Sequence, residues 1–285
     1  MSNQVIIQGS SINILGDEKS KKFMGNTLGW VAGELNQDCY QFNKVKFQDG
    51  DVFLDIGGNL GLLAIYLAKK HPFLKIYSFE ADPRNFEIYQ KHIDLNGLKD
   101  HKNLKVFNLA VSSNNKGIYV SSPPDKEPGG SYTSQTRGEI KIPSITLDAI
   151  FKQFNLSKVK FLKIDVEGAE YPIILASKLI KKHKVRIENV AIELHCTSKF
   201  RYKKFIKYLT NKLYLPELYH KSIRMVFSVE LQPSVGGFLS KFEKFFDKYL
   251  YFTDSYLKVL NNILLKILAP FLSYYLKLIN DRNRF

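Results

Sequence analysis

Cysteine is scarce in this chain, which holds only Cys39 and Cys196 among its 285 residues. The two form no Cys-x-x-Cys pair, and no cluster of histidine and cysteine has the spacing of zinc ligands. A disulfide scaffold and a structural zinc module are therefore excluded. So little cysteine fits a reducing compartment best, and we expect a cytoplasmic protein.

Segments that direct a protein to or through a membrane are also lacking. The N-terminus, MSNQVIIQGS, has neither the basic start nor the apolar core of a signal peptide. No apolar run of about 18 residues is free of charge, so we expect no membrane-spanning helix.

Acidic residues are sparse in the C-terminal part. Residues 1–180 carry 22 Lys and Arg against 19 Asp and Glu, a balance of +3, whereas residues 181–285 carry 20 against 8, a balance of +12. The basic character of the C-terminal part favours an anionic partner, such as a membrane surface, a phosphorylated substrate or nucleic acid. A merely solvated lysine-rich surface explains the same charge.

A glycine turn joins a strand pattern to a helix pattern in Asp51–Gly61, DVFLDIGGNLG. Val52–Ile56 is a short apolar run, typical of a strand that is buried on both faces. Gly57 and Gly58 follow directly, and a helical apolar pattern begins at Leu62. Such a turn lets the backbone approach a ligand closely, next to the free N–H groups of the helix N-terminus.

The next strand pattern indicates the class of ligand. Lys75–Glu80 ends in an acidic residue about 25 positions after Asp55, where an acidic side chain in a doubly wound sheet reaches the ribose of an adenosine-containing cofactor. The turn reads Asp-x-Gly-x-Asn-x-Gly, which is not the Gly-x-Gly-x-x-Gly of nicotinamide dinucleotide proteins. An adenosine cofactor other than NAD is indicated.

The remaining patterns continue the alternation of strand and helix. They predict an α/β fold with a doubly wound, seven-stranded, mostly parallel sheet. We expect strands at Leu104–Val111, Val159–Ile164 and Asn189–Leu194, β-like runs within Leu218–Leu231, and helices from Pro83, from Leu147, at Ala169–Ile180 and at Phe200–Leu213.

Residues 112–145 interrupt the alternation with a β-like run at Gly117–Ser121 and a loop, SSPPDKEPGGS, that would overhang the carboxyl edge of the sheet. Residues 1–50 hold β-like runs at Val5–Ile7 and Ile12–Leu15, then a less patterned stretch to Phe47.

Four motifs resemble the FkbM family of S-adenosylmethionine-dependent O-methyltransferases, a family of class I. They are DIGGNLG, FEADPRNFEIYQKHIDLNG, LAVSS and KIDVEGAE, which follow one another in the family's order between about Asp49 and His195. The resemblance implies S-adenosylmethionine as cofactor, with the cofactor-binding residues Asp55, Gly57, Gly58, Asn59, Gly61, Glu80, Ala81, Ala110 and Asp165. Gly58 stands where the family usually has alanine, a change that we expect to be sterically mild.

Methyl transfer to a hydroxyl needs a base, because a neutral hydroxyl is a poor nucleophile. Three candidate catalytic residues follow the central strands: Asp165 and Glu167 after the fourth strand and His195 after the fifth. His195 is the best base on its intrinsic pKa, although a surface or capping role is an equal alternative. Glu167 could pair with Lys163, unless strand alternation places that lysine on the other side. Asp165, Glu167, Glu193 and His195 could assemble a divalent site, but no ligand set is compelling and we assign no metal.

Three regions are expected: an N-terminal segment that packs on the core (1–48), a methyltransferase domain (49–234) and a basic, aromatic helical extension (235–285). Glu34 or Asp38 of the first could line the site, or lie on the surface. In the extension, aromatic residues and lysines at helical spacing suit a helix at an anionic membrane surface through 236–285, which would hold the protein peripherally at the inner membrane face. Packing on the core or on a second subunit is an equal alternative.

The resemblance implies an O-methyltransferase that acts on a hydroxyl of a carbohydrate or of a glycan- or lipid-linked precursor. A same-fold alternative is an RNA or DNA methyltransferase, which the charge favours. Against a nucleic-acid substrate, Pro123-Pro124 lies between Ser122 and Asp125 and so fails the Asp/Asn-Pro-Pro-Tyr/Phe motif of amino-methylating enzymes. The alternative from another class is a non-catalytic, membrane-associated scaffold with the S-adenosylmethionine fold.

Overall fold

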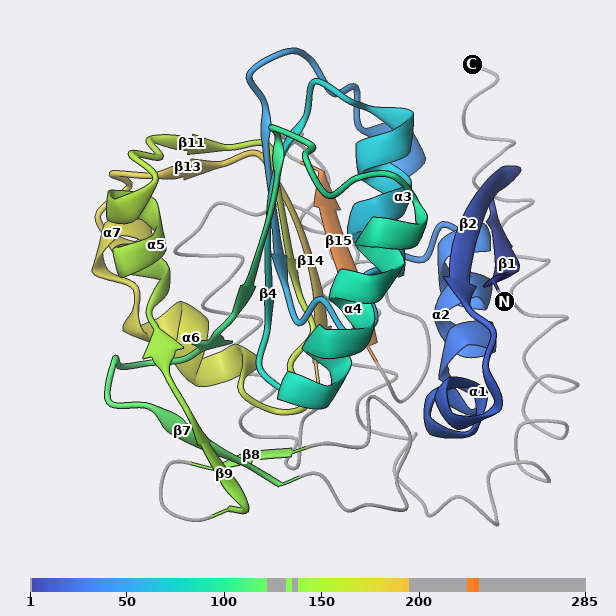
Figure 1. The fold of residues 1–285 in the computed structure, drawn as a ribbon. Coiled ribbons are helices and arrows are strands. Elements are labelled where there is room, and N and C mark those ends of the chain that lie inside the picture. Colours follow the sequence, from blue (N-terminus) through green and yellow to red (C-terminus); the bar gives the residue numbers. More distant parts are fainter. Residues whose placement is uncertain (1, 122–131, 135–137, 195–224, 231–285) are drawn as a thin grey trace, which may run out of the picture. The chain divides into compact units, whose positions relative to one another are not determined.

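The structure is a computed structural model that describes residues 2–121, 132–134, 138–194 and 225–230 (Figure 1). Several features discussed above lie outside these ranges. They are the loop at 122–131, His195, the helix expected at 200–213, the first part of the run expected at 218–231, and the extension 235–285.

A six-stranded sheet forms the centre of the described chain, with the order β15-β14-β12-β3-β4-β5. Its strands are β3 (Val52–Ile56), β4 (Lys75–Glu80), β5 (Leu104–Asn108), β12 (Phe161–Ile164), β14 (Asn189–Leu194) and β15 (Met225–Glu230). Five strands are parallel and β15 runs antiparallel to β14. The predicted bounds of β3, β4 and β14 are confirmed, and so is the doubly wound α/β fold.

Helices cover both faces of the sheet. Figure 1 shows α3 (Leu62–Lys70) and α4 (Pro83–Leu95) on one face, and α5 (Leu147–Gln153), α6 (Glu170–Ala176) and α7 (Lys178–Lys181) on the other. Because successive side chains of a strand point to opposite faces, Phe53 and Phe161 pack with α3 while Leu54 and Leu162 pack with α5. Among these and the other described helices, none is long and apolar enough to cross a bilayer.

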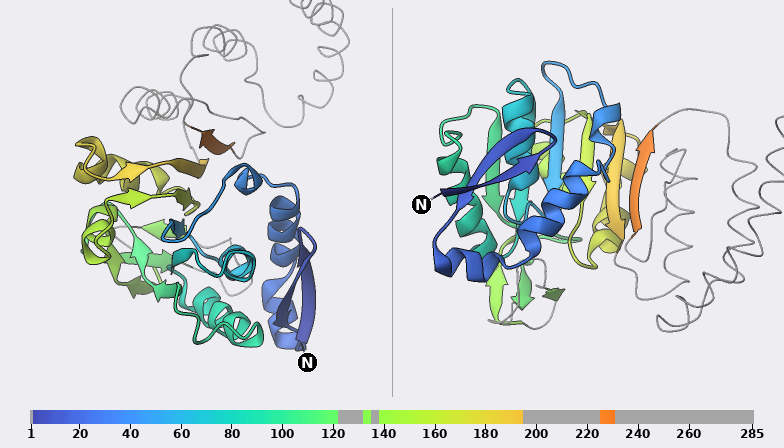
Figure 2. Two further views of the ribbon diagram at one scale, coloured as in Figure 1. Left: turned by 90° about the horizontal axis from the view of Figure 1, so that it is seen from above. Right: turned by 90° about the vertical axis from the view of Figure 1, so that its right-hand side faces the viewer.

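The N-terminal segment lies beside α3 and α4 (Figure 2). It contains β1 (Ser2–Ile7), β2 (Ser10–Leu15), α1 (Glu18–Met24), α2 (Thr27–Asn36) and the 3₁₀ turn η1 (Phe42–Lys44). Asn13 and Asn96 exchange backbone and side-chain hydrogen bonds of 3.0 and 2.8 Å between β2 and the end of α4. Sequence reasoning missed α1 and α2, because α2 reads TLGWVAGELN, with two glycines and an exposed Trp30 in place of an apolar stripe.

The third strand predicted at Leu104–Val111 is wrong beyond Asn108. The Asn108 amide donates to the carbonyl oxygens of Glu80 and Ala81, at 3.0 and 3.2 Å, and the chain leaves the sheet there. β6 (Ala110–Val111) then pairs in parallel with β10 (Ser144–Ile145). Between them, β7 (Ile118–Ser121) is the central strand of a small antiparallel sheet with β8 (Tyr132–Ser134) and β9 (Ile140–Ile142).

The single helix predicted at Ala169–Ile180 is interrupted at Ser177. Ser177 has extended backbone angles, and its hydroxyl accepts from Ile180 N at 3.2 Å, so it caps α7 as a new helix. The Asp148 carboxylate of α5 accepts from Ser177 and from Lys178 N. The strand predicted at Val159–Ile164 likewise divides into β11 (Lys158–Val159), which pairs with β13 (Arg186–Ile187), and β12.

Candidate active site

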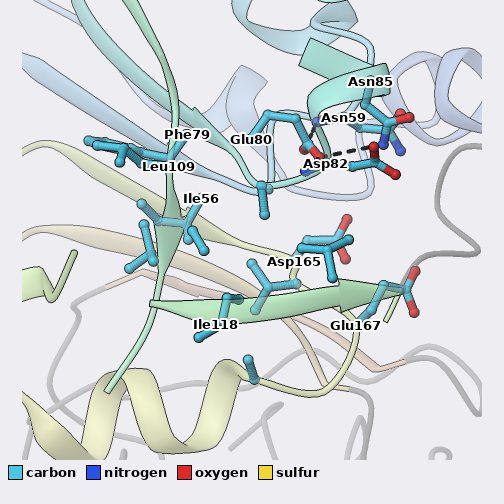
Figure 3. A pocket seen from close by; sticks show the side chains of 17 residues that line it. Ile56, Asn59, Phe79, Glu80, Asp82, Asn85, Leu109, Ile118, Asp165 and Glu167 are labelled. Carbon is cyan, nitrogen blue, oxygen red and sulfur yellow. Dashed lines mark hydrogen bonds between the residues drawn. The ribbon is translucent and has the colours of Figure 1, made fainter. Parts of the chain in front are cut away.

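A cavity lies at the carboxyl ends of β3, β4 and β12, next to β6 and β7 (Figure 3). This edge is where ligands bind in open α/β sheets. The lining residues come from the turn after β3, the end of β4, the start of α4, β6, β7 and the turn after β12. They are Ile56, Gly57, Asn59, Phe79, Glu80, Ala81, Asp82, Asn85, Leu109, Ala110, Val111, Ile118, Val120, Asp165, Val166, Glu167 and Ala169.

The cavity brings together most of the site residues predicted from the sequence. Its lining includes Gly57, Asn59, Glu80, Ala81, Ala110, Asp165 and Glu167. Three other predicted residues, Asp55, Gly58 and Gly61, are not among the lining residues. Nor are Glu34 and Asp38.

Gly57 lies where the turn after β3 passes close to the turn after β12. Its φ is +87°, and a Cβ there would lie 1.8 Å from the Asp165 carbonyl oxygen, so no other residue fits. The N–H groups of Gly57 and Gly58 both donate to Phe79 O, each at 2.9 Å. These bonds tie the turn after β3 to the end of β4.

Gly58 and Gly61 make room for the buried ring of Tyr89 on α4. A Cβ on Gly61 would lie 2.0 Å from that ring. A Cβ on Gly58 would lie 2.5 Å from Ser78 Oγ and 2.9 Å from Tyr89 Cε1. The expectation that alanine at position 58 is a mild change is therefore wrong in this chain, because Tyr89 and Ser78 already occupy the space.

The Glu80 carboxylate binds the turns on either side of it. Oε2 accepts from Asn59 N at 2.7 Å, and Oε1 accepts from Asp82 N at 2.8 Å and from Asn85 Nδ2 at 3.4 Å. Glu80 is only 7% exposed. Burial raises the pKa of its carboxyl to about 7, against the opposing effect of the hydrogen bonds from Asp82 and Asn59.

Asp55 is fully buried, beneath the cavity rather than on its wall. Its Oδ2 accepts from Ser78 Oγ at 2.8 Å, and its Oδ1 lies 3.5 Å from Lys163 Nζ. Burial raises the pKa of Asp55, and Lys163 opposes that rise. The position indicates that Asp55 shapes the turn from behind.

Lys163 is a functional candidate that sequence reasoning did not assign to the site. Its ammonium donates to Gly57 O at 2.7 Å and lies 3.5 Å from both Asp55 Oδ1 and Asp165 Oδ2. The carboxylates beside it are thus Asp55 and Asp165, and the pairing suggested with Glu167 is wrong. Burial alone would lower the pKa of Lys163, but the carboxylates of Asp165, Asp55 and Glu193 outweigh burial and raise it. The sequence did contain a sign of this role, which is a lysine within the apolar strand FLKI. A charge that is buried in such a strand needs a partner of opposite charge.

Comparison with known proteins identifies the family. The family model described as the Methyltransferase FkbM domain matches residues 55–227. The chain belongs to the FkbM methyltransferase family. It is therefore a methyltransferase, and its sheet is that of the class I S-adenosylmethionine-dependent methyltransferases.

Relatives of this FkbM methyltransferase share only moderate identity with it. Methyltransferase 1 of Beauveria bassiana is 28% identical, over 56% of this chain and 70% of the relative. The 31-O-demethyl-FK506 methyltransferase FkbM of Streptomyces tacrolimicus is 22% identical, over 55% and 70%. The hexuronic acid methyltransferase AglP of Haloferax volcanii is 23% identical, over 51% and 58%. Among solved structures, M. capricolum TrmK with S-adenosylhomocysteine has a TM-score of 0.39 and 17% identity, over 86% of this chain and 94% of that one.

The three predicted catalytic residues of this FkbM methyltransferase differ in position. Asp165 lies at the cavity beside Lys163, with 25% of its side chain exposed. Glu167 is exposed and has a φ of +52° in the next turn, where Glu170 Oε1 accepts from Gly168 N at 3.0 Å. His195 lies outside the residues that the structure describes. Within the ranges that the structure describes, no three metal-ligating side chains converge.

Proposed function

We propose that this protein is an S-adenosylmethionine-dependent O-methyltransferase that methylates a hydroxyl of a carbohydrate or of a glycan- or lipid-linked precursor. The observation that carries the proposal is that Gly57 and Asn59 of the glycine turn, Glu80 and Asp165 line one and the same cavity. An enzyme of this kind has to hold an adenosine cofactor and a reacting hydroxyl at one edge of its sheet.

The lining residues fit the two parts of the adenosine group. Glu80 is an acceptor placed for ribose hydroxyls, and the Asn59 Oδ1 atom beside it is buried without a hydrogen-bond partner in the described chain. Ala81 and Ala110, with the apolar side chains of Ile118 and Val120 on β7, form a slot for the flat base. Bound S-adenosylmethionine supplies a methyl group that its sulfonium already activates.

The chain's own residues align the acceptor and take its proton. Asp165 and Glu167 stand at the cavity, and His195 follows the adjacent strand β14 in the sequence. One of the three accepts the proton of the acceptor hydroxyl as the new oxygen–methyl bond forms and the sulfur–methyl bond breaks. Lys163 keeps the Gly57 turn in place and balances the negative charge of Asp165 and Asp55.

Relatives support the choice of oxygen and of a sugar. One bears the name of an O-demethyl-FK506 methyltransferase and another that of a hexuronic acid methyltransferase. The balance of +12 in residues 181–285 suits an acceptor that carries phosphate, as nucleotide-linked and lipid-linked sugars do.

The test is transfer of label from methyl-labelled S-adenosylmethionine to a panel of free sugars, sugar nucleotides and lipid-linked sugars. We expect an alkali-stable label, because a methyl ether resists base whereas a methyl ester is cleaved. Label that is released by alkali would assign the chemistry to a carboxyl group, and label that follows added RNA or DNA and is lost after nuclease treatment would assign it to nucleic acid. Cofactor binding without transfer to any acceptor would favour the scaffold alternative.

A further inference from the structure

Asn85 has a buried side-chain amide at the cavity, and the proposed function gives this residue no role. It lies in the first turn of α4, two residues after Pro83, and is 4% exposed. Its Nδ2 donates to Glu80 Oε1 at 3.4 Å, a long hydrogen bond, and its Oδ1 is buried without a hydrogen-bond partner in the described part of the chain.

An unpartnered buried oxygen is costly, so it calls for a partner that arrives with a ligand. The hydrogen bond from the amide is long, and the last side-chain torsion of asparagine is broad. Rotation about that torsion would turn Oδ1 toward a donor in the cavity, which Asn85 lines.

The corner around Asn85 is rich in acceptors. The Glu80 carboxylate is adjacent, and Asn59 Oδ1 is a second buried oxygen that lacks a partner among the described residues. Figure 3 shows the three side chains grouped at one end of the cavity. Because the side chains of Glu80 and Asn85 are in contact, a ligand that satisfies both acceptors needs two hydrogen-bond donors close together.

We propose that Asn85 binds one hydroxyl of the cofactor's ribose diol while Glu80 binds the other, which makes Asn85 a specificity residue for a ribose over a deoxyribose. This inference rests on the proposed cofactor. A vicinal diol supplies two adjacent O–H donors, one for the carboxylate and one for the amide oxygen. Removal of either hydroxyl leaves a buried acceptor unsatisfied, and such sites discriminate more strongly than apolar pockets do.

The experiment measures the affinity of three ligands by calorimetry: S-adenosylhomocysteine, its 2′-deoxy analogue and its 3′-deoxy analogue. Wild type, Asn85→Ala and a control, Gln90→Ala, are compared. Gln90 is an exposed amide on the same helix, and its removal should change nothing. Wild type should bind both deoxy analogues about tenfold or more weakly than the parent ligand. Asn85→Ala should lose affinity for the parent ligand by a similar factor, and should no longer distinguish it from one of the two analogues.

Two results overturn the inference and leave the proposed methyl transfer standing. One is wild type that binds both deoxy analogues as tightly as S-adenosylhomocysteine, a result that does not depend on whether any variant folds. The other is Asn85→Ala that weakens all three ligands by the same factor, which is what a purely structural role of Asn85 produces. Wild type that binds none of the three would remove the proposed function and this inference with it.

Discussion

Lys163 Nζ donates a hydrogen bond of 2.7 Å to the carbonyl oxygen of Gly57, across 106 residues of sequence. The bond fixes the glycine turn from the neighbouring strand β12. Since Lys163 also lies 3.5 Å from Asp55 and from Asp165, one buried ammonium connects the turn, the carboxylate beneath it and the carboxylate at the cavity. The sheet places these groups side by side, because Lys163 is in register with Asp55.

Replacement of Lys163 is expected to destabilise the protein through the charge that it leaves behind. Lys163→Met removes one partner of a buried pair, and such changes cost about 3–5 kcal/mol in the free energy of unfolding. The double variant Lys163→Met, Asp55→Asn should recover part of that loss in denaturant unfolding, because it also removes the uncompensated charge. A double variant as unstable as the sum of the two single variants would show that the pair is not coupled.

Gly58→Ala is expected to lower the free energy of unfolding by about 1–3 kcal/mol, the usual cost of an overpacked core. The added methyl group would meet Ser78 Oγ and the Tyr89 ring. Gly33→Ala is the matched control, because nothing lies within 4 Å of a Cβ there and the residue is in α2. The control should raise the free energy of unfolding by about 0.5–1 kcal/mol. Equal changes in the two variants would contradict the tight packing around Gly58.

Binding of S-adenosylhomocysteine should strengthen as the pH rises. Burial raises the pKa of Glu80 to about 7, and ribose hydroxyls donate best to the ionised carboxylate. Ionisation rises from about one tenth at about pH 6 to nine tenths at about pH 8, so the affinity should increase about tenfold. Glu80→Gln should bind more weakly and without this pH dependence, whereas Glu87→Gln, at an exposed carboxylate on α4, should keep it. A wild-type affinity that is constant across this range would count against Glu80 as the ribose ligand.

The stability of the protein without cofactor should show the opposite trend. The Glu80 carboxyl titrates near 4.5 when unfolded and near 7 when folded, so between these values the folded protein holds a proton that the unfolded chain has lost. The contribution of Glu80 to the free energy of unfolding therefore falls as the pH rises through this window. Denaturant unfolding of wild type and Glu80→Gln at several pH values measures that contribution, as the difference between their free energies of unfolding. If wild type becomes more stable relative to Glu80→Gln as the pH rises, the raised pKa of Glu80 is contradicted.

The base is found by comparing three variants, Asp165→Asn, Glu167→Gln and His195→Ala. The variant that lacks the base should bind S-adenosylhomocysteine normally and turn over about a hundredfold or more slowly. A variant that loses cofactor affinity instead identifies a binding role. Turnover that is unchanged in all three would mean that none of them takes the proton.

The sequence predicted the parts of this molecule that depend on short-range pattern. β3 and β4 are apolar runs bounded by turn residues, and the rule that ligands bind at carboxyl ends was enough to bring Gly57, Glu80 and Asp165 to one site. The sequence alone could not predict contacts between residues on neighbouring strands and helices. The hydrogen bond from Lys163 to Gly57 O depends on which strands are neighbours, and the space at Gly58 depends on Tyr89, which a helix delivers from elsewhere in the chain.

Two further differences between the predicted and the observed elements are caused by hydrogen bonds of single polar side chains. Ser177 ends α6 because a distant carboxylate, Asp148, stabilises a new helix start there. Leu104–Val111 divides because Asn108 bonds to the end of β4. In both places a polar side chain overrides an apolar run.

Calorimetric titration of the full chain with S-adenosylhomocysteine, alongside Glu80→Ala, measures whether this cavity holds the cofactor. We expect stoichiometric binding by wild type and an affinity at least about tenfold weaker in Glu80→Ala. Well-folded wild type that does not bind, or a Glu80→Ala variant that binds as tightly as wild type, would contradict the assignment of this cavity to the cofactor.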